Sequence, residues 1–153
     1  MKIWLTWSGG IGLVAAVTLQ FTNPAHLNPA VQPGCDVLAS NAPPPSVAAL
    51  LKNACYNCHS DETVWPWYSF IAPVSWSVVG HVNDGRRAMN FSQWPHDDAS
   101  RARKRWRRIG DEVDSEEMPL RSYTLVHPEA RLTREQRKQI VQWADDITLR
   151  LKD

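Results

Sequence analysis

The sequence predicts an all-α protein, because apolar residues recur at helical spacing in several segments and no segment alternates with the two-residue period of a strand. Helix-capping residues stand directly before several of these segments. About four helices are therefore expected behind an apolar N-terminal run. They cover residues 46–55, 73–90, 98–113 and 133–151.

The apolar run from Ile3 to Phe21 contains no charged residue. As a helix it would extend about 28 Å, close to the hydrocarbon thickness of a bilayer. Lys2 precedes the run, and positive charge favours the cytoplasmic side of a membrane. We therefore predict a transmembrane anchor over residues 1–22 that leaves the remaining chain in the periplasm, with a cleaved signal peptide as the alternative.

Residues 23–45 are rich in proline and show no helical period. Such a composition predicts an extended spacer that separates the anchor from a domain over residues 46–153. The spacer contains Cys35, which is interpreted as a bystander thiol, with an intermolecular disulfide as the alternative.

The first two helices of the domain are predicted from their caps and apolar faces. Ser46 is an expected N-cap for a helix that leads straight into Cys55. Pro73 suits the first turn of the next helix, which should end near Asn90. The apolar positions are Val47, Leu50, Leu51 and Ala54 in the first helix, and Trp76, Val79, Val82 and Met89 in the second.

The last two helices carry stronger capping signals. Asp97 or Asp98 can cap a helix that carries the basic run 101–108. This run is interpreted as a solvated face, with a docking patch for an acidic redox partner or anionic lipid as the alternative. Thr133 and Gln136 form a capping box for the final helix. Its apolar stripe consists of Ile140, Trp143, Ala144, Ile147 and Leu151.

The motif Cys55-Tyr56-Asn57-Cys58-His59 carries the clearest chemistry. One helical turn brings two thiols three residues apart to the two vinyl groups of a haem, and the adjacent histidine can bind the iron. A zinc site would need a second ligand pair, a thioredoxin-like pair would follow a strand, and a disulfide would leave His59 unexplained. The motif therefore favours one covalently bound haem c.

Several further strings resemble the small bacterial haem-binding domain family of membrane-anchored monohaem c-type cytochromes. The resemblance extends from Ser46 onwards. It implies a cytochrome c-like haem domain. The matching strings are 55–60, 65–68, 71–76, 85–86, 90–94, 118–119, Tyr123, 127–128 and 143–144.

Met118 is the expected second axial ligand opposite His59. It precedes Pro119 in a loop after the third helix, and this Met-Pro pair resembles the distal strap of small cytochromes c. A histidine in its place, or Met89, or an open site, is the alternative.

Aromatic and basic side chains are the candidates for contact with the haem. The aromatic residues could instead be buried in an ordinary core. Arg86 is the candidate partner of a haem propionate, and a place on a solvated helix face is the alternative for it. The aromatic candidates for contact with the haem are Trp67, Tyr68, Trp76 and Trp94. Trp65 is a further candidate for the wall of the haem pocket.

An iron held by His59 and Met118 suits an electron carrier, since no catalytic acid or base is then needed. A peroxidase-like enzyme or a haem-based sensor would require an open distal position. The expected partners are periplasmic or membrane redox proteins and the inner membrane. Nucleic acid is not expected, because the formal net charge is only +1.

Overall fold

Helices make up all the regular structure in the part of the chain that the computed structural model describes, residues 2–95 and 98–151, with side chains described for residue 10 and from residue 12 onwards. The predicted all-α class is therefore confirmed. The longer helices are α1 (Lys2–Gln20), α3 (Pro45–Ala54), α5 (Val74–Ala88), α6 (Ala99–Asp114) and α8 (Arg134–Arg150). The shorter ones are α2 (Val37–Asn41), α4 (Tyr56–His59) and α7 (Arg121–Val126), with 3-10 turns η1 (Trp67–Phe70), η2 (Phe91–Gln93) and η3 (Pro128–Ala130).

The four expected domain helices are all present, as α3, α5, α6 and α8, and two of their caps are confirmed. The carboxylate of Asp98 accepts a hydrogen bond from the backbone N–H of Arg101 at 3.0 Å, whereas Asp97 lies outside the described residues. Both hydrogen bonds of the Thr133–Gln136 capping box are formed. The expected cap at Ser46 is wrong, because α3 begins one residue earlier, with Pro45 in its first turn.

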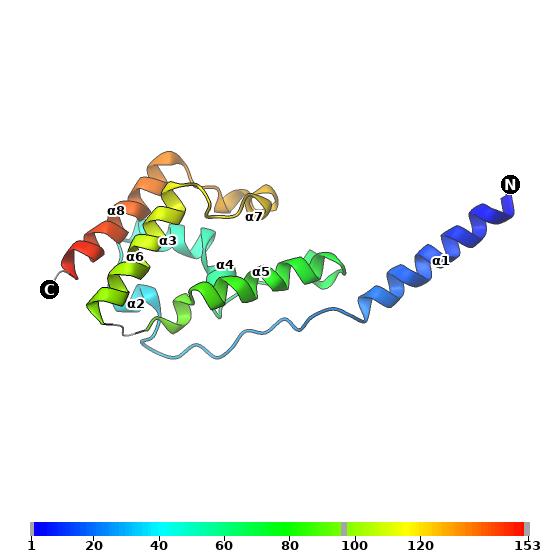
Figure 1. Cartoon of the computed structure of the whole chain (residues 1–153), viewed down its shortest axis with the longest axis horizontal. Helices are drawn as coiled ribbons and strands as arrows, with labels where there is room; N and C mark the ends of the chain where they lie inside the picture. Colours follow the sequence, from blue (N-terminus) through cyan, green and yellow to red (C-terminus); the bar gives the residue numbers. More distant parts are fainter. Residues whose placement is uncertain (1, 96–97, 152–153) are drawn as a thin grey trace.

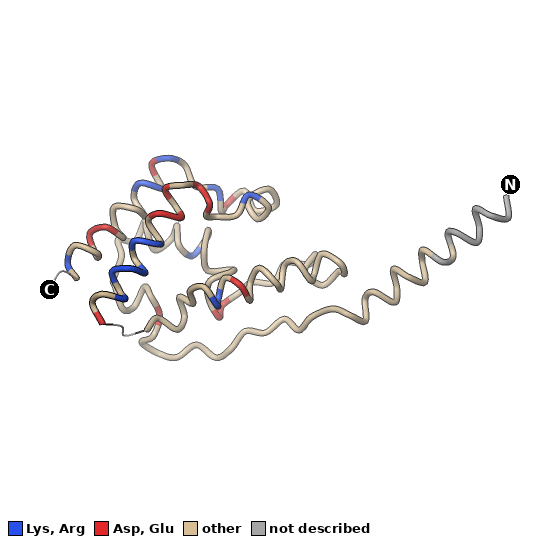
Figure 2. The backbone as a smooth tube through the Cα atoms, in the orientation of Figure 1, with Lys and Arg blue, Asp and Glu red and all other residues tan. Residues whose placement is uncertain are grey.

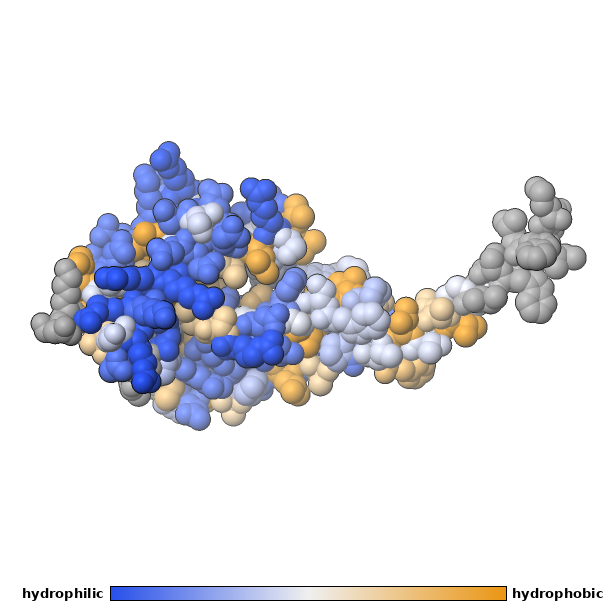
Figure 3. All heavy atoms as spheres, in the orientation of Figure 1, coloured by the Kyte–Doolittle hydropathy of each residue, from blue (hydrophilic) through white to orange (hydrophobic). Residues whose placement is uncertain are grey.

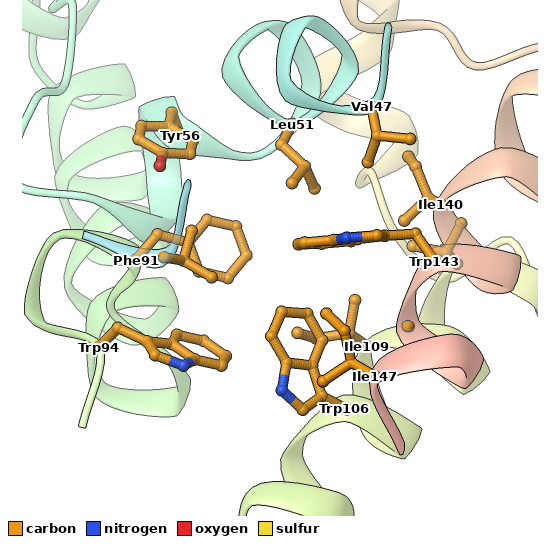
Figure 4. Packing of buried hydrophobic residues seen from close by; sticks show 13 residues of the cluster. Val47, Leu51, Tyr56, Phe91, Trp94, Trp106, Ile109, Ile140, Trp143 and Ile147 are labelled. Atoms are coloured by element: carbon orange, nitrogen blue, oxygen red, sulfur yellow. The ribbon is translucent and has the colours of Figure 1, made fainter. Parts of the chain in front are cut away.

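The core lies where α3, α6 and α8 meet (Figure 4). Helix α8 packs along α6, and three indoles run through the contact: the ring centroid of Trp106 lies 4.9 Å from that of Trp94 and 4.8 Å from that of Trp143. Large aromatic side chains contribute much of the apolar area that a small domain buries. Leu51 of α3 and Ile140 of α8 complete this core, with exposed fractions of 1% and 0%.

The proline-rich segment has no helix before α2, makes a turn at residues 33–34, and lies along the domain (Figure 1). Asp36 caps α2, and Val37 is buried among the core residues with an exposed fraction of 1%. The packed core therefore begins before the expected boundary at Ser46.

Helix α1 points away from the domain, at the end opposite α8 (Figure 1). Within the residues that are described, no helix reaches the length and hydropathy required to cross a bilayer.

Candidate functional site

The Cys-x-x-Cys-His motif occupies a helical turn of its own. Helix α3 ends at Ala54, its C-cap Cys55 has a φ of −122°, and α4 starts with the residue after Cys55. The backbone N–H groups of Cys58 and His59 both donate to the carbonyl of Cys55, at 3.2 and 2.9 Å. Both thiols of the motif are free, which is the form that can add to vinyl groups. This arrangement fits the spacing expected for haem attachment.

Tyr56 fixes this turn to the rest of the domain. Its ring is 2% exposed, and its hydroxyl donates to the carboxylate of Asp36 at 2.8 Å. The ammonium of Lys52 lies 3.8 Å from the ring centroid, in cation–π contact. The segment before the domain thus helps to position the motif.

A glycine of α5 allows this helix to approach the motif closely. A Cβ atom added at Gly85 would lie 2.5 Å from the carbonyl oxygen of Cys58. Real Cβ atoms essentially never come so close to another atom, so only glycine fits without a shift. Helix α5 therefore sets the position of the turn that carries Cys58 and His59.

The His59 ring is prepared for iron binding. Its Nδ1 lies 3.1 Å from the carbonyl oxygen of Met89, and because a carbonyl can only accept, Nδ1 carries the proton and Nε2 keeps its lone pair. Burial also lowers the pKa of His59, which favours the neutral imidazole that a metal requires.

Met118 lines the same hollow as this ring. Two adjoining cavities of about 90 and 200 Å³ are each lined by both His59 and Met118. Cys55 lines the smaller cavity and Cys58 the larger one. The loop that carries Met118 is fixed by α8, since Arg137 of that helix donates a hydrogen bond to the carbonyl of Met118 at 2.9 Å. Between them, the two cavities are therefore lined by two thiols, one imidazole and one thioether, and this donor set fits a c-type haem.

The hollow continues into an apolar cavity of about 430 Å³ next to Cys58. Trp67 and Tyr68 from η1 line it, and Trp67 is 75% exposed; contact of either ring with a haem stays a prediction. Val82 of α5 and Val126 of α7 line other parts of the same cavity.

A hydrogen-bonded chain of titratable side chains lies along this cavity and was not predicted. The Tyr68 hydroxyl is 2.6 Å from Nε2 of His127, and Nδ1 of His127 is 2.7 Å from the Glu129 carboxylate. The carboxylate accepts from Nδ1–H, so Nε2 accepts from the phenol. Tyr123 stacks on His127 with ring centroids 4.3 Å apart. Burial raises the pKa of Tyr68, which therefore holds its proton.

Two aromatic residues expected at the site lie elsewhere. Trp94 is 7% exposed and stacks in the core, and Trp76 is 43% exposed with its indole N–H on the carbonyl of Thr22 at 3.1 Å. Trp76 is thus not part of the apolar stripe of α5, whose buried residues are Ser75, Val79 and Val82.

The Arg86 side chain makes its hydrogen bonds and its ion pair with other residues of the protein. Its guanidinium donates to the carbonyls of Ser60 and Leu27, at 2.7 and 2.6 Å, and to the side chains of Asn28 and Thr63. It also pairs with the buried carboxylate of Asp61 at 3.7 Å. These contacts make Arg86 a tie between α5 and the segments before it, and not a free partner for a propionate.

The remaining histidines have different surroundings. His81 is exposed and lies at the rim of both the 200 and the 430 Å³ cavities. His26 stacks on Phe70, and His96 lies outside the described residues. Among the described residues, no cluster of three or more His, Cys, Asp or Glu side chains could hold a metal ion.

Comparison with known proteins agrees with this geometry. No curated protein and no solved structure matches the chain. One family model, described as a haem-binding domain, matches residues 14–146 and so covers the site, the segment before the domain and the domain as far as residue 146 in α8. The chain belongs to the haem-binding domain family.

Proposed function

We propose that the protein is a monohaem c-type cytochrome that transfers electrons between redox partners at the periplasmic face of the inner membrane. Thioether bonds to Cys55 and Cys58 would hold the haem, and His59 and Met118 would bind the iron from opposite sides. When bound, the haem supplies one-electron chemistry. The periplasmic or membrane redox proteins on either side of this transfer are part of the proposal.

One observation carries the proposal: the hydrogen bond from Nδ1 of His59 to the Met89 carbonyl, which leaves Nε2 available in a hollow that Met118 also lines. Ligand orientation by a backbone carbonyl raises the basicity of the imidazole. A thioether as second ligand favours ferrous iron and raises the reduction potential. With His59 and Met118 as ligands, the remaining residues would need only to limit the access of water, and the mainly apolar lining of the hollow suits that role.

The anchor is proposed to be α1. Because the described residues alone contain no spanning helix, the proposal rests on the sequence of α1: its 19 residues correspond to about 28 Å, and the chain carries no Lys, Arg, Asp or Glu between residues 3 and 35. Lys2 at the start favours a cytoplasmic N-terminus.

The attachment is tested by making the full chain in bacteria that possess a c-type haem maturation system. We expect the purified chain to weigh one haem more than its amino acids, and the haem to stay with the protein in acidified acetone. Cys55→Ser or Cys58→Ser should each remove one thioether bond, whereas the control Cys35→Ser should leave both. A wild-type chain that carries no covalent haem under these conditions would refute the proposal.

A peroxidase-like activity is the second candidate, because the chain Tyr68–His127–Glu129 supplies an acid and base beside the same hollow. Such an enzyme needs an open or displaceable iron ligand. Carbon monoxide separates the two functions, since it binds reduced haem only where a position is open. No binding supports the carrier, and stoichiometric binding supports the enzyme.

A further inference from the structure

The end of α1 is fastened directly to the haem domain. The side chain of Gln20 makes two hydrogen bonds to Ala72: its Nε2 donates to the backbone carbonyl at 3.3 Å, and its Oε1 accepts from the backbone N–H at 3.0 Å. Ala72 lies between η1 and α5, far from Gln20 in sequence. The domain therefore begins at the last turn of the N-terminal helix.

The residues after Gln20 strengthen this connection. Asn23 donates to the carbonyl of Phe70 at 3.1 Å and accepts from the hydroxyl of Ser75 at 2.5 Å. Nε2 of His26 donates to the carbonyl of Ser69 at 2.8 Å, and its ring stacks on Phe70 with centroids 4.1 Å apart. This segment is held against η1 and α5, so it does not act as a free tether between helix and domain.

Large apolar side chains are exposed around this connection, and we call them the junction face. They are Phe21, Phe70, Ile71 and Trp76, with exposed fractions of 87%, 52%, 44% and 43%. None of them lines the three cavities of the site, so a bound haem would not cover them. Four such side chains are exposed on three segments that hydrogen bonds hold together, and a gathering of exposed apolar side chains marks an interaction site.

Charged residues are absent from the segments that form this end of the domain. The chain has no Lys, Arg, Asp or Glu between residues 3 and 35, nor between residues 63 and 83. Figure 2 shows the charged residues on the rest of the domain, and Figure 3 shows hydrophobic residues at the end next to α1 and hydrophilic ones at the opposite end. This separation favours a bilayer as the occupant over a charged protein surface.

We infer that the junction face rests in the interfacial layer of the membrane, as a second membrane contact beside α1. The inference rests on the proposed anchoring by α1, which places Phe21 near the edge of the hydrocarbon core. Tryptophan is favoured at this depth because its ring is apolar and its N–H is polar, and the Trp76 N–H already bonds to the Thr22 carbonyl. Trp67 and Val74, which line the 430 Å³ cavity, would then lie beside the bilayer, and electron exchange there would occur close to the lipid surface.

Spin labels on the full, haem-loaded chain test this inference. In a Cys35→Ser background, a label is attached at Ile71→Cys or Phe21→Cys, with Asp145→Cys on the exposed surface of α8 as the control. The protein is reconstituted in vesicles of phosphatidylcholine and phosphatidylglycerol. Collision with lipid-soluble oxygen is then compared with collision with a water-soluble nickel chelate.

We expect the nickel chelate to collide several-fold less often with the labels at 71 and 21 than with the label at 145, and oxygen to show the opposite order. Equal accessibility of 71 and 145 to the chelate in vesicle-bound protein overturns the inference while the anchor stands. Shielding of the label at residue 71 from both reagents, together with dipolar broadening between labels, would mean that a second copy of the chain covers the junction face. This result would also overturn the inference. Protein that does not float with the vesicles refutes both the anchor and the inference, whereas a missing haem refutes only the proposed electron transfer.

Discussion

Replacement of Gly85 by alanine tests the close contact between α5 and the haem-attachment turn. The added Cβ would lie 2.5 Å from the Cys58 carbonyl oxygen and 3.1 Å from its carbonyl carbon, whereas ordinary contacts begin at 3.4 Å. The turn would have to move by close to the difference, about 0.9 Å at the oxygen. The obstructing atoms are backbone and cannot rotate away. Overpacking of this kind costs about 1–3 kcal/mol.

Gly80→Ala is the matched control, because Gly80 lies in the same helix and an added Cβ there meets nothing within 4 Å. Both substitutions gain about 0.5–1 kcal/mol of helix propensity, so this gain cancels when they are compared. The measurement is urea unfolding of the haem-loaded chain in detergent, followed by circular dichroism. We expect Gly80→Ala to be as stable as the wild type or more so, and Gly85→Ala to be less stable than Gly80→Ala by about 1–3 kcal/mol. Equal stability of the two variants would show that α5 does not press on the motif.

Three other predictions follow from the contacts of single residues. Met118→Ala should remove the weak red absorption band of thioether-bound ferric haem and lower the reduction potential. The control Met89→Leu should leave the band and the potential unchanged. An unchanged spectrum of Met118→Ala would mean that another residue is the second iron ligand. Arg86→Met removes the cation beside the buried Asp61 carboxylate, which keeps its hydrogen bonds from the side-chain amides of Asn90 and Gln93. It should lower the free energy of unfolding by up to about 3–5 kcal/mol, whereas the exposed neighbour Arg87→Met should cost about 1 kcal/mol or less; similar losses in thermal or urea unfolding would contradict this. Burial raises the pKa of Tyr56, so the folded chain keeps a proton that the unfolded chain loses above the ordinary value of 10.0. The unfolding free energy should therefore fall as the pH rises beyond 10.0, and fall less in Tyr56→Phe; parallel pH profiles would argue against this.

The haem-binding domain family was recognised correctly from the sequence strings, and the family match confirms it. The helix caps at Asp98 and Thr133 were also predictable, because a cap depends on residues two or three positions apart. The expected ligand Met118 does face the same hollow as His59, although its bond to iron stays a prediction.

The spacing of apolar residues determined that α5 exists, but not which of its faces is covered. Trp76 was expected in the apolar stripe, yet its indole N–H donates to the carbonyl of Thr22, two residues after α1, and its ring is partly exposed at the surface. Trp94 was expected beside the haem, yet its ring packs against that of Trp106 in the core. Spacing along one helix gives the relative directions of side chains, whereas the neighbouring element that meets each direction comes from elsewhere in the chain.

The sequence by itself determined the all-α class and the haem-binding family, because both are recorded in short strings of consecutive residues. Only the tertiary structure decided that the Met89 carbonyl orients His59 and that Tyr68 meets His127, 59 positions away. It also decided that the proline-rich segment lies along the domain instead of separating it from α1. Contacts between distant segments depend on how whole elements pack, and no local pattern records that packing.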